Sequence, residues 1–119
     1  MMTRELTFHV SELRALSKFL CGLADVASDR LSLTQAAFFL QAAIADAAGR
    51  PSTRTEIITS NRTWIRGSIR NSYRQLLEPS RVYPNALGWL RTVENPLDAR
   101  EKVLRLTDKG REIVEQAIR

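Results

Sequence analysis

The sequence predicts a mainly α-helical domain that carries one small β-hairpin. Apolar residues recur at spacings of three and four in several segments, as they do on one face of an amphipathic helix. Residues 90–110 instead read as a strand, a charged turn, a second strand and a capped helix start. At 119 residues, the chain is expected to form a single domain.

The first half of the sequence predicts an extended arm and two helices. Residues 5–10 alternate between apolar and polar side chains, which predicts a short strand or arm. Ser11 is the expected cap of a helix over 12–27. Thr34 is the expected cap of a helix over 35–48, which is apolar nearly all round and should therefore lie in the core.

Two further helices are expected to form a helix-turn-helix. The first covers 54–60, where Thr53 and Glu56 have the spacing of a capping box. The second covers 64–77 and stops before Pro79, because the residue before a proline disfavours the helical conformation. The turn between them is short enough for the second helix to enter a DNA major groove. Its apolar stripe consists of Ile65, Ile69, Tyr73 and Leu76.

The last third predicts a loop, the hairpin and a final helix. Residues 79–89 contain two prolines and a glycine and are expected to be irregular. Asn95-Pro96 marks the turn of the hairpin, and Thr107 is the expected cap of the final helix. A basic hairpin after a helix pair has the layout of a DNA-binding wing, so the expected fold is a winged helix-turn-helix. Its parts are an arm and helix at 1–30, a core with the wing at 31–107 and a final helix at 108–119.

The positive charge is concentrated in the middle of the chain. The formal net charge is +5, and residues 50–105 alone carry eleven Lys or Arg against five Asp or Glu. A polyanion is the expected partner of such a segment, and double-stranded DNA is the leading candidate. The alternative is an ordinary solvated surface rich in arginine.

Several basic and polar residues are candidates for DNA contacts. Arginine forks onto guanine and asparagine pairs with adenine in the major groove, whereas other cations bind phosphates and fix the position of the protein. The expected major-groove set on the fourth helix is Arg66, Arg70, Asn71 and Arg74, and the small side chain of Ser68 is expected to let the start of this helix approach the phosphates closely. The expected phosphate contacts are Arg54 and Arg62, and the expected wing contacts are Arg91, Arg100 and Lys102.

Three segments resemble signatures of the MarR family of winged helix-turn-helix transcription factors, in the family's order. These are Leu87-Gly88-Trp89-Leu90-Arg91, Asn95-Pro96-Leu97-Asp98-Ala99-Arg100-Glu101 and Leu104-Arg105-Leu106-Thr107-Asp108-Lys109-Gly110. The resemblance spans 31–116 and implies that Asp98 orients Arg100, which then enters the minor groove. It also implies a homodimer on a pseudo-palindromic site and allows for a small-molecule effector of unknown identity. Residues 80–86 are an insertion relative to the family pattern.

The sequence is also compatible with a function other than DNA binding. A winged helix can also serve as a protein-binding adaptor or anti-repressor, and Tyr83, Leu87 and Trp89 offer an aromatic contact surface. No catalytic constellation is apparent around the single histidine, so no enzyme activity, metal or cofactor is expected. An effector pocket lined by Trp64, Phe38 and Phe39 competes with the simpler reading of these residues as core.

The expected compartment is the cytoplasm, with no membrane partner. No apolar run approaches the length that a bilayer requires, and the N-terminus has no secretory signal pattern. Cys21 is the only cysteine, so the chain cannot form an intramolecular disulfide.

Overall fold

The structure is a computed structural model that describes residues 7, 9–27, 31–60 and 69–118. Its helices are α2 (Val10–Ala27), α3 (Leu33–Ala47), α4 (Arg54–Ser60), α5 (Ile69–Ser72) and α6 (Asp108–Ile118), and a 3₁₀ turn, η2 (Tyr73–Leu76), follows α5 directly. Strands β1 (Leu90–Asn95) and β2 (Asp98–Leu106) pair in an antiparallel hairpin. The prediction of a mainly helical chain with one small hairpin is confirmed, and the arrangement is compatible with a winged helix-like fold.

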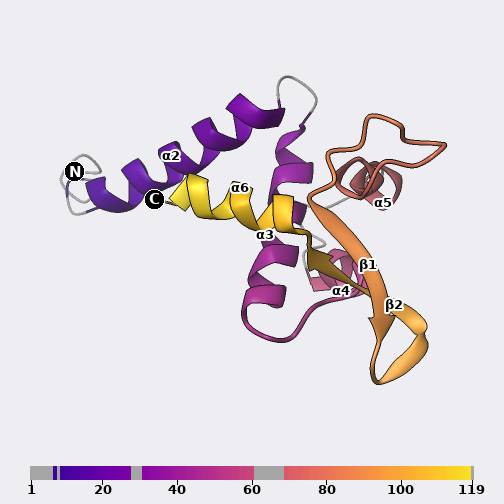
Figure 1. The fold of residues 1–119 in the computed structure, drawn as a ribbon. Coiled ribbons are helices and arrows are strands. Elements are labelled where there is room, and N and C mark those ends of the chain that lie inside the picture. Colours follow the sequence, from indigo (N-terminus) through magenta and orange to yellow (C-terminus); the bar gives the residue numbers. More distant parts are fainter. Residues whose placement is uncertain (1–6, 8, 28–30, 61–68, 119) are drawn as a thin grey trace.

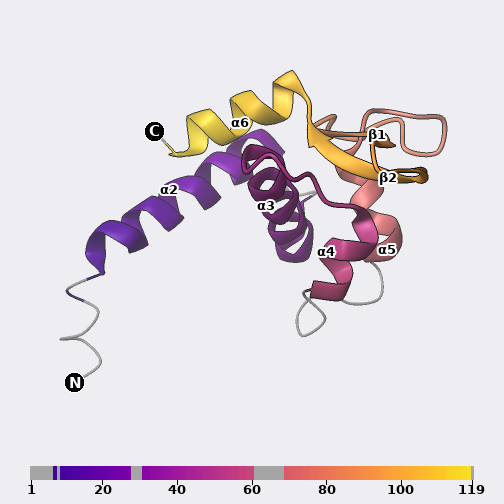
Figure 2. The same cartoon turned by 90° about the horizontal axis from the view of Figure 1, so that it is seen from below.

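The central helix α3 separates two ends of the molecule (Figure 1). At one end α2 and α6 lie side by side, and at the other end α4, α5 and the hairpin gather, as the view from below also shows (Figure 2). The core between these ends contains Phe38, Phe39 and Trp89, each at most 1% exposed. The rings of Phe39 and Trp89 lie 5.0 Å apart, so the residue just before the hairpin is packed directly on α3.

The N-terminal prediction of a strand is wrong for the described residues of that segment. Thr7 is helical and Val10 begins α2, ahead of the predicted cap Ser11. The backbone N–H of Leu13 donates to the carbonyl of His9 at 2.9 Å, which is a helical bond. Alternation alone does not make a strand, because a strand also needs a neighbour, and the described sheet consists of β1 and β2 alone.

Helix α3 begins two residues before the position that the sequence suggested. Ser32, not Thr34, is the N-cap, and its hydroxyl accepts a hydrogen bond from the backbone N–H of Gln35 at 3.0 Å. The Gln35 side chain returns a bond to the N–H of Ser32 at 2.8 Å, which completes a capping box. The helix ends as predicted, since Gly49 adopts a positive φ of 81° directly after the C-cap.

Helix α4 has the predicted bounds and the predicted cap, and this cap also contacts the hairpin. The Thr53 hydroxyl accepts from the N–H of Glu56 at 3.0 Å, and the Glu56 carboxylate accepts from the N–H of Thr53 at 2.9 Å. Thr53 also forms an isolated antiparallel bridge with Val103, and the N–H of Leu104 donates to the carbonyl of Ser52 at 2.9 Å. The start of α4 is therefore fixed directly against β2.

The fourth predicted helix is described only from Ile69 onward, where the prediction of a helix that ends before Pro79 holds. Its last turn tightens into the 3₁₀ turn η2, whose C-cap is Leu77. Of its predicted stripe, Ile69 and Leu76 are buried and Tyr73 is half-buried, whereas Ile65 lies outside the described residues.

The segment between η2 and the hairpin contains no helix or strand, as predicted from its prolines and glycine. It closes as a loop, because the N–H groups of Leu87, Gly88 and Trp89 donate back to carbonyls of residues 75–77 at 2.7 to 2.9 Å. These bonds place the start of β1 beside the end of η2.

Thr107 caps α6 as predicted, and its hydroxyl accepts from the N–H of Gly110 at 3.0 Å.

Candidate nucleic-acid interface

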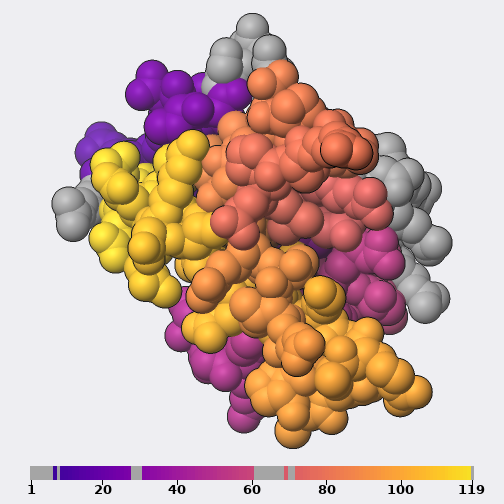
Figure 3. Space-filling view, turned by 45° about the vertical axis from the view of Figure 1, so that its right-hand side comes forward, coloured from indigo at the N-terminus to yellow at the C-terminus, as the bar shows by residue number. Residues whose placement is uncertain are grey.

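A groove of about 400 Å³ runs between the start of α4, the turn η2 and the inner side of the hairpin. Figure 3 shows the hairpin projecting below the 69–90 segment on this side of the molecule. The groove is lined by Thr53, Arg54, Thr55, Tyr73, Arg74, Thr92, Arg100, Glu101, Lys102 and Leu104.

Four of the residues that line the groove carry a positive charge. They are Arg54 on α4, Arg74 on η2, and Arg100 and Lys102 on β2, and all four are exposed. Glu101 is the only carboxylate among the lining residues. Cations from three separate elements therefore face one concave surface, which favours the approach of a polyanion. All four were predicted as DNA contacts.

An aromatic ring supports one of these cations. The guanidinium carbon of Arg54 lies 5.5 Å from the centre of the Tyr73 ring. Tyr73 in turn lies 5.7 Å from the buried ring of Phe38. A guanidinium over a ring face is attracted by the ring quadrupole, so Tyr73 links the position of Arg54 to the core.

An irregularity in the hairpin brings three consecutive residues to the groove. The register runs regularly from Leu90↔Leu106 to Glu94↔Lys102, but the next pair is Asn95↔Asp98. Residues 99–101 of β2 are therefore left without partners on β1, as in an enlarged β-bulge. A regular strand alternates its side chains between two faces. The bulge removes this alternation at Arg100 and Glu101, so both line the groove together with Lys102, which is regularly paired with Glu94.

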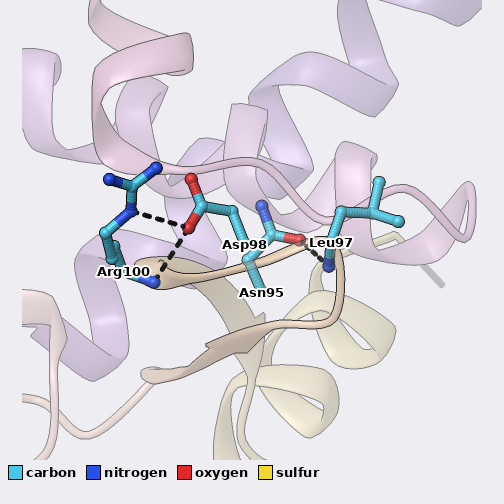
Figure 4. A network of polar contacts seen from close by, with 4 residues as sticks. All are labelled: Asn95, Leu97, Asp98 and Arg100. Atoms are coloured by element: carbon cyan, nitrogen blue, oxygen red, sulfur yellow. Dashed lines mark hydrogen bonds and ion pairs between the residues drawn. The ribbon is translucent and has the colours of Figure 1, made fainter.

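The Asp98 carboxylate holds Arg100 in this bulge (Figure 4). Its Oδ1 accepts the backbone N–H of Arg100 at 3.1 Å and the side-chain Nε at 3.3 Å. The Arg100 side chain is nevertheless 91% exposed, so Asp98 sets its direction without covering it. The family resemblance implies this contact between Asp98 and Arg100, and the structure shows it.

The base of the hairpin is anchored to α3 by a buried carboxylate. Asp46 Oδ1 accepts Nε of Arg105 at 2.9 Å, and its Oδ2 accepts the backbone N–H of Leu106 at 2.8 Å. Together with the Thr53–Val103 bridge, these bonds fix β2 against two helices. The wing side of the groove therefore has a defined position relative to α4.

The remaining predicted contacts fall elsewhere. Arg91 is exposed on β1 opposite Arg105 and does not line the groove. Arg62, Arg66 and Ser68 lie outside the described residues. Arg70 and Asn71 belong to α5, but their side chains also lie outside the part of the chain that is described.

The residues proposed for an effector pocket and an aromatic surface are mostly core. Phe38 and Phe39 are fully buried, Trp89 is 1% exposed, and Trp64 lies outside the described residues. Tyr83 and Leu87 are half-buried in the 79–89 loop.

The described residues contain no group of His, Cys, Asp or Glu arranged to hold a metal ion. None of the described helices has the length and apolar character to cross a bilayer.

Tyr73, Thr92 and Asp46 are among the contributors to the groove or to its support that sequence reasoning missed. Tyr73 was assigned to the inward stripe of its helix, although it also lines the groove. Thr92 carried no signal, since a threonine in a strand is ordinary. Asp46 was missed because an acidic residue in the last turn of a helix opposes the helix dipole and suggests no structural partner.

Comparison with known proteins adds no assignment, because the chain matches no family model, no curated protein and no solved structure.

Proposed function

We propose that this protein is a cytoplasmic transcriptional regulator that binds double-stranded DNA in a sequence-specific manner. The observation that carries the proposal is the convergence of Arg54, Arg74, Arg100 and Lys102 on one groove. Phosphates of a duplex are the polyanion that such a groove suits, because several cations at separate points neutralise successive phosphates. The resemblance of the wing to that of MarR regulators supports the same reading.

Each side of the groove has a distinct role in this proposal. Arg54, Arg74 and Lys102, which line the groove together, bind phosphates and position the protein. Arg74 thereby moves from the major-groove set expected from the sequence to the phosphate contacts. Arg66, Arg70 and Asn71 remain the proposed contacts to base edges in the major groove. Arg100 extends from the bulge of the wing into the minor groove, where narrow A·T-rich stretches concentrate negative potential. Its contact with Asp98 reduces the number of orientations that the guanidinium samples before binding.

The partner that we propose besides DNA is a second copy of the chain. Helix α2 exposes a stripe of apolar side chains, of which Leu13, Leu16 and Leu20 are 47% to 59% exposed. Leu16 and Leu20 also line an apolar pocket with Leu33 of α3. A contiguous apolar surface of this kind marks an interface, and two copies joined there present two wings to two half-sites of a palindrome.

An adaptor that binds protein without contacting DNA is the alternative, and it loses support from the burial of Trp89. Its experimental signature is co-purification with a protein partner and no retention on duplex DNA.

The proposal is tested by selecting binding sites from a pool of random duplexes and measuring affinity for the winning site at several salt concentrations. Enrichment of a pseudo-palindrome, with affinity that falls steeply as salt rises, is the expected result. No enrichment and no salt-dependent binding would contradict it.

A further inference from the structure

The tip of the hairpin carries an apolar side chain that the described part of the fold leaves uncovered. Leu97 is 94% exposed, the highest value among the large apolar side chains in the described residues. It occupies the turn between β1 and β2, next to Pro96, which is also exposed. Isolated exposed leucines are common, so exposure alone carries no function.

The backbone around Leu97 is constrained, and this distinguishes it from an ordinary exposed leucine. Its N–H donates to the Asn95 side chain Oδ1 at 3.0 Å, and Pro96 fixes its own φ (Figure 4). On the other side of Leu97, the Asp98 carboxylate accepts the N–H of Arg100 at 3.1 Å. Two side-chain-to-backbone bonds therefore define the turn, and an apolar group projects from it at little further entropic cost on binding.

The surroundings of Leu97 favour one class of occupant. Arg100, held by the neighbouring Asp98, is 91% exposed at the same end of the hairpin, and Lys102 follows on the same strand. An apolar tip followed on the same strand by two exposed cations, one of them held by the Asp98 carboxylate, matches the minor groove, where phosphates line both edges and deoxyribose and base edges form the walls and floor. A bare apolar protein pocket would have to desolvate these cations.

We propose that Leu97 is an apolar wedge that enters the minor groove beside Arg100 and that the protein bends the DNA it binds. The inference rests on the proposed DNA-binding function. Apolar side chains inserted at a base step unstack it in part and bend the duplex toward the major groove. Arg100 then supplies the electrostatic attraction, and Leu97 supplies the deformation.

The test uses the full chain and a selected duplex with a donor and an acceptor dye at its two ends. The wild-type protein should raise the transfer efficiency, because bending brings the ends together. Leu97→Ala should lose most of this increase and weaken binding about tenfold, since the side chain no longer exchanges water for sugar and base contacts. Leu97→Met should retain both, because methionine also acts as a wedge.

A matched control is Val82→Ala, which truncates an apolar side chain that is 73% exposed in the loop before the hairpin. It should bend and bind as the wild type does. Both alanine variants should unfold at the wild-type temperature, because neither position is buried.

The outcomes separate this inference from the function on which it rests. Salt-dependent binding by the wild type without any change in transfer efficiency would overturn the wedge and leave the DNA-binding proposal standing. The same holds if Leu97→Ala bends DNA as the wild type does. Absence of duplex binding by the wild type would overturn both.

Discussion

The buried carboxylate of Asp46 pairs with the guanidinium of Arg105 and thereby joins the end of α3 to the wing. The Asp46 side chain is 4% exposed, whereas that of Arg105 is 44% exposed. One carboxylate oxygen accepts Nε of Arg105 and the other accepts the N–H of Leu106. Because both oxygens have donors, the cost of burying this charge is offset by charge-assisted hydrogen bonds.

Loss of this carboxylate should destabilise the fold. Asp46→Ala leaves the N–H of Leu106 without its acceptor and should lower the free energy of unfolding by about 2–3 kcal/mol. Asp46→Asn should lie between this variant and the wild type, because an amide oxygen still accepts one hydrogen bond but lacks the charge. Urea titration followed by circular dichroism measures both. An unchanged unfolding midpoint for Asp46→Ala would show that the contact is dispensable.

Two glycines should respond to alanine in opposite directions. A Cβ on Gly110 would overlap the backbone carbonyl of Trp89 and crowd Leu106, so Gly110→Ala should destabilise by about 1–3 kcal/mol or more. A Cβ on Gly22, within α2, would meet Ala117 at 3.5 Å, which is ordinary contact. Gly22→Ala should therefore stabilise by about 0.5–1 kcal/mol through helix propensity. Thermal unfolding of the two variants checks this, and a shift of the same sign in both would contradict the packing described.

The pair formed by Asp98 and Arg100 should matter for binding and not for folding. Asp98→Ala and Arg100→Ala should leave the unfolding temperature unchanged, because an exposed ion pair contributes little to stability. Arg100→Ala should weaken duplex binding most at A·T-rich flanks, and Asp98→Ala should weaken it less. A double-mutant cycle on binding affinity should show coupling between the two positions. Strictly additive effects would mean that Asp98 does not position Arg100 for DNA.

The apolar stripe of α2 should control the oligomeric state. Leu16→Glu places a charge in the proposed interface and should shift the protein from dimer to monomer in sedimentation velocity runs. Lys18→Glu places the same carboxylate on the same helix, reversing the charge of an exposed position away from the stripe, and should leave the dimer intact. A monomeric wild type, or a Leu16→Glu variant that remains dimeric, would rule out this interface.

Local signals in the sequence predicted most of the elements. Helix caps and terminating glycines act on residues a few positions away, so they can be predicted from the sequence without knowledge of the fold. Examples are the capping box of Thr53 and Glu56, the cap at Thr107 and the positive φ of Gly49. The cap of α3 was misplaced because Ser32 and Thr34 are both good capping residues. Only the bond from Gln35 back to Ser32 decides between them.

Long-range features were not predictable from the sequence. The bulge at residues 99–101 depends on the pairing register, and the Asp46 contact joins residues that lie 59 positions apart. Gly110 belongs to a segment that resembles a MarR signature. The need for a glycine at this position becomes clear only in the fold, where the carbonyl of Trp89 lies against α6 and leaves no room for a Cβ. The groove was not predicted; the sequence predicted a set of DNA-contacting residues, and the fold adds that four of them share one surface.

The dependence of duplex affinity on salt tests the central claim most directly. The wild type should bind its selected duplex with an affinity that falls linearly with salt on logarithmic axes. Arg74→Gln/Lys102→Gln should reduce the magnitude of that slope by about two, because two phosphate contacts are lost. Lys18→Gln/Arg111→Gln removes the same charge from exposed positions on α2 and α6 and should leave the slope unchanged. Binding that is insensitive to salt, or equal slopes for the two double variants, would contradict the assignment of the groove to DNA.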